Sequence, residues 1–348
     1  MQLLGHEDVF DQFRRRITRG RLASTFLFIG PQGIGKRSAA VRLAQALLCH
    51  VNPVEELRPC ERCESCIQVD AGTHPDLEIV AKPADKNFIP VELFIGDKEH
   101  RMREGLCHNI SLKPFFGGRK IAIIDDADYL NQEGANCLLK TLEEPPPQSV
   151  LILIGTSEQR QLPTIRSRCQ LVRFKPLASE QVSQLLIEHQ VVSDQAAADQ
   201  LAAHAHGSLL KARELADPAL SEFRQRFLSE LSGGKFHSVS LAKEMNAFVD
   251  SVAKEAPPRR ARLRQIIGFA TDFYRELMYQ WNGIGNGTDP TITTAAVTAR
   301  RNWPGDDTTA AQCVDICIDS LAHVDANANL TTLIDYWLDE LGRAAARA

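Results

Sequence analysis

The chain has 348 residues, too many for one compact core, and its 44% hydrophobic and 24% charged residues are typical of a soluble globular protein. The formal net charge of −4 provides no overall attraction for nucleic acid, so a DNA contact requires a local basic patch. Residues 1–11 lack the hydrophobic stretch of a secretory signal, and no apolar run is long enough to span a bilayer. We therefore expect a cytoplasmic protein with no membrane partner, whose nine cysteines are metal ligands or buried thiols rather than disulfides.

Apolar runs alternate with helical stretches over residues 1–175. A glycine loop and then a predicted helix, Arg37–Cys49, follow the first run. Continuous apolar runs fit buried parallel strands, and their alternation with helices predicts an α/β domain. The expected strands are Thr25–Ile29, Leu77–Val80, Lys120–Ile124 and Ser149–Ile154.

Only helical signals follow in the rest of the chain. Residues 176–217 predict a small helical domain, with Ser179 as a candidate N-cap and Gly207 as a break. Residues 218–348 predict a larger helical domain, in which Asn282–Asp307, rich in Gly, Thr, Asn and Asp, is expected to be a long loop. An amphipathic helix is predicted near the end, with an apolar face of Leu330, Leu333, Ile334, Trp337, Leu338 and Leu341.

A candidate phosphate loop joins the first predicted strand to the helix that follows it. Its glycines allow backbone N–H groups to turn toward one point at the helix N-terminus, where Lys36 would reach the β- and γ-phosphates. The next position should carry Ser or Thr, whose hydroxyl holds magnesium, but here it is Arg37. We therefore favour weak binding of ATP or ADP over a loop kept only for the fold, and we do not expect efficient hydrolysis. The loop glycines are Gly30, Gly33 and Gly35.

Acidic and polar residues follow two other predicted strands, at the edge of a parallel sheet where ligands bind. Asp125 is a candidate for holding magnesium through water, and Asp126 stands where a water-activating Glu is expected, with a shorter reach. Thr156, after the next strand, suits a sensor of the γ-phosphate. The alternatives are that the acids only cap the next helix and that Thr156 belongs to a simple turn. The glycine loop upstream favours a nucleotide site.

A cysteine-rich module occupies residues 49–66. Three of its thiols are separated by gaps of two residues, and a fourth stands eleven positions before them. Such spacing wraps thiolates around one ion, and four soft ligands favour a structural, tetrahedral zinc site over free thiols. A nucleic-acid-binding role is disfavoured because the module lacks interleaved aromatic and basic residues. The predicted ligands are Cys49, Cys60, Cys63 and Cys66, with His50 as the alternative to the first of them.

Together these motifs resemble the clamp-loader subunits of bacterial DNA polymerase III, a family of the AAA+ ATPase lineage. The resemblance covers essentially the whole chain and is most specific over residues 25–175. It implies an AAA+ α/β domain with an inserted zinc knuckle (1–175), a small helical lid (176–217) and a helical collar (218–348). The segments that carry it are the cysteine module, Leu139–Pro146, Ser167-Arg168-Cys169, the start of the chain from Gly5 and Asn327–Leu330.

The family contains ATP-hydrolysing gamma/tau motors and delta-prime stators. The motor has an arginine in a Gly-Ser-x-Arg pattern where this chain has Leu210, and Arg37 and Asp126 are further departures. These departures favour the delta-prime type, with an active gamma/tau-type motor as the alternative. The resemblance then implies a hetero-pentamer with gamma/tau and delta that loads the sliding clamp onto primed DNA. It also implies that Arg168 acts as an arginine finger on a neighbour's ATP; its alternative is a surface salt bridge.

Overall fold

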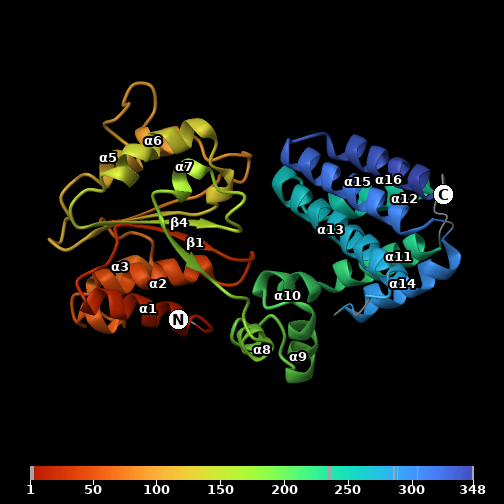
Figure 1. Ribbon diagram of the computed structural model, residues 1–348, viewed down its shortest axis with the longest axis horizontal. Coiled ribbons are helices and arrows are strands. Elements are labelled where there is room, and N and C mark those ends of the chain that lie inside the picture. The colour runs from red at the N-terminus through yellow and green to blue at the C-terminus, as the bar shows by residue number, and fades with distance from the viewer. Residues whose placement is uncertain (1–3, 234–236, 285–286, 288, 304, 347–348) are drawn as a thin grey trace. The chain divides into compact units, whose positions relative to one another are not determined.

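The computed structural model describes residues 4–233, 237–284, 287, 289–303 and 305–346 (Figure 1). Residues 1–3, which belong to the N-terminal stretch that lacks the features of a secretory signal, therefore lie outside the described residues. The chain divides into two compact units, residues 1–213 and 214–348. The finer division into three domains stays a prediction. No described helix is both long and apolar enough to cross a membrane.

A five-stranded parallel sheet forms the centre of the first unit. All four predicted strands are present, and a fifth, short and partly polar, was not predicted. Because every neighbouring pair is parallel, the loops that follow the strands at their carboxyl ends meet at one edge of the sheet. In the order β2-β3-β4-β1-β5, the strands are β1 (Thr25–Ile29), β2 (Leu77–Val80), β3 (Lys120–Ile124), β4 (Ser149–Gly155) and β5 (Gln170–Arg173).

Helices cover both faces of this sheet (Figure 1). Alternate residues of a strand point to opposite faces, so Phe26 and Phe28 pack on the side of α1 and α2, whereas Leu27 packs on the side of α4, α5 and α6. The helices of this layer structure are α1 (Glu7–Thr18), α2 (Lys36–Leu48), α3 (Glu64–Asp70), α4 (Glu92–Ile95), α5 (Leu106–Asn109), α6 (Gln132–Glu143) and α7 (Pro163–Arg166). Two short 3-10 helices, Val54–Glu56 and Ala127–Tyr129, lie in the connections.

Three helices follow the sheet: α8 (Ser179–Glu188), α9 (Gln195–His204) and α10 (Leu209–Leu215). Gly207 breaks the helical run as predicted, with φ of +74°, and a Cβ there would lie 2.4 Å from the carbonyl oxygen of Leu177. The expectation of Ser179 as an N-cap is wrong by one residue. Ala178 has the extended N-cap backbone, and its N–H donates to the Gln181 side chain at 3.0 Å.

The described part of the second unit is helical, as predicted. The six residues expected on the apolar face of the last helix are all buried, and Trp337 is completely inaccessible. Helix α13 packs along α14 and α15. The helices are α11 (Pro218–Ser232), α12 (Ser238–Asp250), α13 (Ala256–Trp281), α14 (Pro290–Asn302), α15 (Asp307–Asp325) and α16 (Leu330–Ala346).

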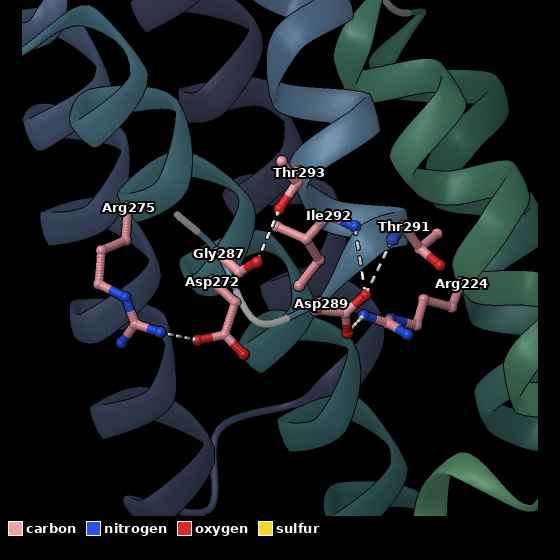
Figure 2. A network of polar contacts seen from close by, with 8 residues as sticks. All are labelled: Arg224, Asp272, Arg275, Gly287, Asp289, Thr291, Ile292 and Thr293. Atoms are coloured by element: carbon pink, nitrogen blue, oxygen red, sulfur yellow. Dashed lines mark hydrogen bonds and ion pairs between the residues drawn. The ribbon is translucent and has the colours of Figure 1, made fainter. Parts of the chain in front are cut away.

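The expectation of a long loop over Asn282–Asp307 is wrong, because α14 forms inside it; residues 285, 286, 288 and 304 of that range lie outside the description. The Asp289 carboxylate accepts from the N–H groups of Thr291 at 3.0 Å and Ile292 at 3.3 Å, and so caps the helix. The same carboxylate pairs with the buried guanidinium of Arg224 (Figure 2). Capping and burial together stabilise a helix whose Thr-rich composition is a poor helix signal.

Candidate nucleotide site and cysteine cluster

The predicted phosphate loop lies between β1 and α2. Gly33 and Gly35 have φ of +77° and +92°, in the left-handed region that favours glycine. A Cβ on Gly33 would lie 2.4 Å from the Ser208 hydroxyl oxygen, and one on Gly30 would lie 2.6 Å from the carbonyl oxygen of Phe174. Backbone conformation and close packing therefore both require the glycines that the sequence supplies.

A cavity of about 220 Å³ lies beside this loop, at the carboxyl edge of the sheet. It also contains Asp128 and Arg160, which were not predicted. The loop after β1 and the segments after β3 and β4 supply the polar lining, as expected for a ligand site of a parallel sheet. The predicted residues that line it are Gly33, Gly35, Lys36, Arg37, Asp125, Asp126 and Thr156.

The Lys36 side chain points back into its own loop. Its Nζ donates to the carbonyl oxygens of Gly30 at 2.7 Å and Pro31 at 2.6 Å, and the residue is buried. Burial lowers the pKa of Lys36, while the carboxylates of Asp128 and Asp125 oppose this shift. The loop carbonyls thus stabilise the ammonium group that was predicted to meet phosphates.

Arg37 extends across the cavity to the strand end. Its guanidinium nitrogen lies 3.4 Å from a carboxylate oxygen of Asp125. The Arg37 side chain is 59% exposed and that of Asp125 only 16%, so an exposed cation faces a sheltered anion. The other oxygen of Asp125 accepts from the N–H of Asp126 at 3.0 Å. The residue expected to hold magnesium therefore already has a cation as its partner.

Asp128 organises the opposite wall of the cavity. Its carboxylate accepts from the Thr156 N–H, with both oxygens at 3.0 Å, from the Thr156 hydroxyl and from the side-chain amide of Gln161. Thr156 is thus held in the strand-end turn by a residue that the sequence analysis missed. Asp126 also lines the cavity, and burial, reinforced by the negative charge of Asp125, raises its pKa.

The phosphate loop is held by contacts from two distant segments of the first unit. The Ser208 hydroxyl donates to the carbonyl of Gln32 at 2.9 Å, and the Leu209 N–H donates to the carbonyl of Gly33 at 2.9 Å. From the other end of the unit, His6 Nε2 donates to the carbonyl of Ile34 at 2.7 Å. Burial is the main reason why the pKa of His6 is lowered. These bonds fix the loop backbone.

Arg168 lies away from this cavity. Its Nε donates to the Glu143 carboxylate at 2.6 Å, and one terminal nitrogen donates to the carbonyl of Thr164 at 2.8 Å. Its own carbonyl accepts from the Thr25 hydroxyl at 2.8 Å, which ties this segment to the start of β1. The Arg168 side chain is 30% exposed, so the guanidinium is anchored and still accessible from outside the chain.

The four predicted cysteines come together between the end of α2, at Cys49, and the first turn of α3, which contains Cys66. Their sulfur atoms all lie within 4.8 Å of one another, and the group could hold a metal ion. The Sγ atoms of Cys60 and Cys66 are 3.9 Å apart, close to the roughly 3.8 Å between two sulfurs bound tetrahedrally to one zinc ion. The N–H of Cys63 points to the Cys60 sulfur at 3.3 Å, and that of Asn52 to the Cys49 sulfur at 3.5 Å.

The fourth place in this group belongs to Cys49. The alternative, His50, packs its ring against Phe116, with 5.1 Å between ring centres. The backbone N–H of Arg62 lowers the pKa of the Cys60 thiol, whereas burial raises the pKa of the Cys66 thiol. Backbone donors and close sulfurs are what a thiolate-bound metal ion needs, so the residues present fit a structural zinc ion.

The cysteine module is joined to α2 by a buried chain of hydrogen bonds. The Asp76 N–H donates to Nδ1 of His74 at 3.0 Å, so the ring's Nε2 carries the proton and donates to the Ser65 hydroxyl at 2.9 Å. That hydroxyl donates to the carbonyl of Leu48 at 2.7 Å. The start of α3 is thereby fixed against the end of α2, which orients the cysteine-bearing turn.

Comparison with known proteins gives the family. The family described as "DNA polymerase III, delta subunit" matches residues 5–178, half of the chain. The chain belongs to this DNA polymerase III family. The resemblance inferred from the motifs is thereby confirmed.

Several members of the polymerase III subunit group are similar to the chain. DNA polymerase III subunit delta' of Bacillus subtilis is 35% identical over 175 residues, which cover 50% of this chain and 49% of that protein. The delta' subunit of Pseudomonas aeruginosa is 36% identical over 156 residues, 43% of each protein. The tau subunit of Escherichia coli is 32% identical over 224 residues, 63% of this chain and 32% of that protein. The chain thus spans half or less of the length of these relatives.

Among solved structures, a gamma subunit-related protein of Thermotoga maritima aligns over 96% of this chain and 99% of that chain, with 16% identity and a TM-score of 0.43.

The family match at residues 5–178 begins at the segment that contains His6 and ends at the residue before α8. It therefore contains the phosphate loop, the cysteine cluster and Arg168. The lining residues that the sequence analysis missed, Asp128 and Arg160, also lie inside this DNA polymerase III family region.

Proposed function

We propose that the chain is a delta-prime-type, non-motor subunit of the DNA polymerase III clamp loader. In this role it assembles with gamma/tau and delta subunits into a hetero-pentamer that loads the sliding clamp onto primed DNA. The observation that carries the proposal is the pairing of Arg37 with Asp125 at the point where a motor needs a magnesium ion. The similarity to delta' subunits in two bacteria supports the same assignment.

The alternative, an active gamma/tau-type motor, requires a complete hydrolytic site. Arg37 offers no hydroxyl to magnesium, Asp126 is a shortened substitute for a water-activating glutamate, and Leu210 replaces the sensor arginine. Each change weakens a different part of the reaction, so we propose at most weak binding of ATP or ADP. An AAA+ α/β domain, a lid over residues 176–217 and a collar over residues 218–348 complete the proposed architecture.

The zinc site is proposed as structural. Four protein sulfurs fill a tetrahedral site and leave no position for a substrate or for catalytic water. When bound, the ion would stabilise the turn between α2 and α3, whose polar residues provide little core of their own. The cysteines would thus keep the module folded and take no part in chemistry.

The active contribution of the chain is proposed to be Arg168, acting on the ATP of a neighbouring subunit. A guanidinium supplied in trans stabilises the charge that spreads over the γ-phosphoryl oxygens in the transition state. The bonds of Arg168 to Glu143 and Thr164 would hold its side chain ready at the surface. Since the chain's own site lacks the residues that a motor needs for hydrolysis, Arg168 would promote ATP hydrolysis at the site of a neighbouring subunit.

This role is tested by DNA- and clamp-stimulated ATP turnover of reconstituted complexes that differ only at residue 168. Arg168→Ala is expected to assemble normally, because a half-exposed ion pair contributes little stability. Loss of one finger costs on the order of 10³-fold or more at the site it serves, although other sites in the ring dilute the total. Arg168→Lys should rescue poorly, because a point charge lacks the planar fork. Equal turnover of well-assembled wild-type and Ala complexes would refute the trans-acting role.

A further inference from the structure

The chain's own nucleotide site has a charge arrangement unlike that of a magnesium-dependent site. A magnesium ion in a phosphate loop is held by a Ser or Thr hydroxyl and, through water, by an acidic strand end. Here the hydroxyl position is Arg37, and the guanidinium of the same residue lies 3.4 Å from the acidic strand end, Asp125. The cation and its carboxylate partner are therefore both supplied by the protein.

Two further charged groups of the cavity, Lys36 and Asp128, also have partners within the protein. Asp128 accepts from Thr156 and Gln161 and is not available to a metal ion. Three basic side chains, Lys36, Arg37 and Arg160, face three acidic ones in the lining. A divalent ion next to Asp125 would be repelled by the adjacent guanidinium, whereas a phosphate would find that cation and the amides of the loop.

We infer that the Arg37 guanidinium takes the place of magnesium, so that this site binds the phosphates of a nucleoside diphosphate or triphosphate without a divalent cation. The inference deepens the nucleotide site of the proposed function and rests on it. Guanidinium groups suit this task, because their planar fork donates two hydrogen bonds to phosphate oxygens. A magnesium-free triphosphate would also lack the ion that bridges the β- and γ-oxygens during transfer, so binding and hydrolysis become separate properties of the site.

The test is calorimetric titration of the full chain with ADP, in excess EDTA and in excess magnesium chloride. Wild-type affinity should be the same within about threefold in the two buffers, a difference well under 1.4 kcal/mol. Arg37→Thr restores the hydroxyl and removes the cation. It should bind ADP about tenfold more weakly in EDTA, as expected for one lost charge-assisted bond, and regain affinity with magnesium. Because the Arg37 side chain is exposed, we expect this variant to fold as the wild type does.

Arg160→Thr is the matched control. It also removes one positive charge from the cavity, but it leaves the pair between Arg37 and Asp125 intact. It should weaken ADP binding equally in both buffers and create no response to magnesium. The inference is overturned if wild-type affinity rises about tenfold with magnesium, if Arg37→Thr is as insensitive to magnesium as wild type, or if wild type binds no ADP in either buffer. None of these results affects assembly with clamp-loader subunits, so failure here is distinct from failure of the proposed function.

Discussion

Replacement of Asp289 tests how the unpredicted helix α14 is stabilised. The carboxylate has two tasks, since it caps the helix through the N–H groups of Thr291 and Ile292 and pairs with Arg224 (Figure 2). Both charged residues are buried, and the Arg224 guanidinium also lies over the ring of Phe269, 5.0 Å from its centre. Asp289→Ala removes the cap and leaves the arginine without its carboxylate in a place that is largely shielded from water.

The expected loss is large for a single side chain. An N-cap contributes about 1 kcal/mol, and breaking one side of a buried ion pair costs about 3–5 kcal/mol, so Asp289→Ala should lower the free energy of unfolding by about 4–6 kcal/mol. Asp289→Asn keeps an oxygen for the cap and loses only the charge, so its loss should be smaller, about 2–3 kcal/mol. In an Arg224→Met background the effect of Asp289→Asn should shrink, because no buried charge remains to be left unpaired.

Urea unfolding followed by tryptophan fluorescence measures this loss in the full chain. All the tryptophans of the sequence, Trp281, Trp303 and Trp337, belong to the second unit, so the signal reports the unit that contains α14. A shift of the transition midpoint at unchanged slope is the expected result. An Asp289→Ala protein whose unfolding free energy lies within about 1 kcal/mol of wild type would refute the reasoning.

Three further predictions concern the first unit. Purified protein should contain about one equivalent of zinc, which a Cys63→Ala, Cys66→Ala double variant should lose, and metal-free wild type after non-chelating purification would contradict the site. The isolated chain should turn over ATP far below about 1 s⁻¹, and motor-like turnover abolished by Lys36→Ala would promote the alternative function. In the folded chain the pKa of His6 lies below its ordinary value of 6.5, so on acidification the unfolded chain binds the proton before the folded chain does. The stability that is present above pH 6.5 is therefore lost as the pH falls. Unfolding of His6→Gln should show a weaker acid dependence than wild type, and an identical dependence would exclude His6 as a cause.

The features that the sequence predicted are those with a strong local signal. Strands such as Ser149–Ile154 are almost wholly apolar because both faces of the sheet are covered, and that pattern is visible without tertiary information. The cysteine cluster was predictable because close spacing alone brings three thiols together. For the fourth ligand, spacing left Cys49 and His50 open. The structure separates them, because the Cys49 sulfur lies within the group and the His50 ring packs on Phe116.

The features that were missed depend on contacts between distant residues. Strand β5 is short and has a polar residue at each end, Gln170 and Arg173, so its sequence carries little hydrophobic periodicity. Its pairing with β1 joins residues far apart in the sequence. Helix α14 has a weak composition, although Asp289 followed by proline is a start signal that could have been read. The role of Asp128 follows from the parallel register that places its loop beside Thr156, and no spacing in the sequence reports that register.

Co-purification of the chain with gamma/tau and delta subunits tests the proposed clamp-loader role most directly. The proteins would be mixed, separated by size-exclusion chromatography and analysed for stoichiometry, with the Arg168→Ala chain as an assembly control. We predict one stable complex that contains all three kinds of subunit and forms equally well with the variant. A chain that elutes alone, or that can replace gamma/tau as the ATP-hydrolysing subunit, would contradict its assignment as a non-motor subunit of the clamp loader.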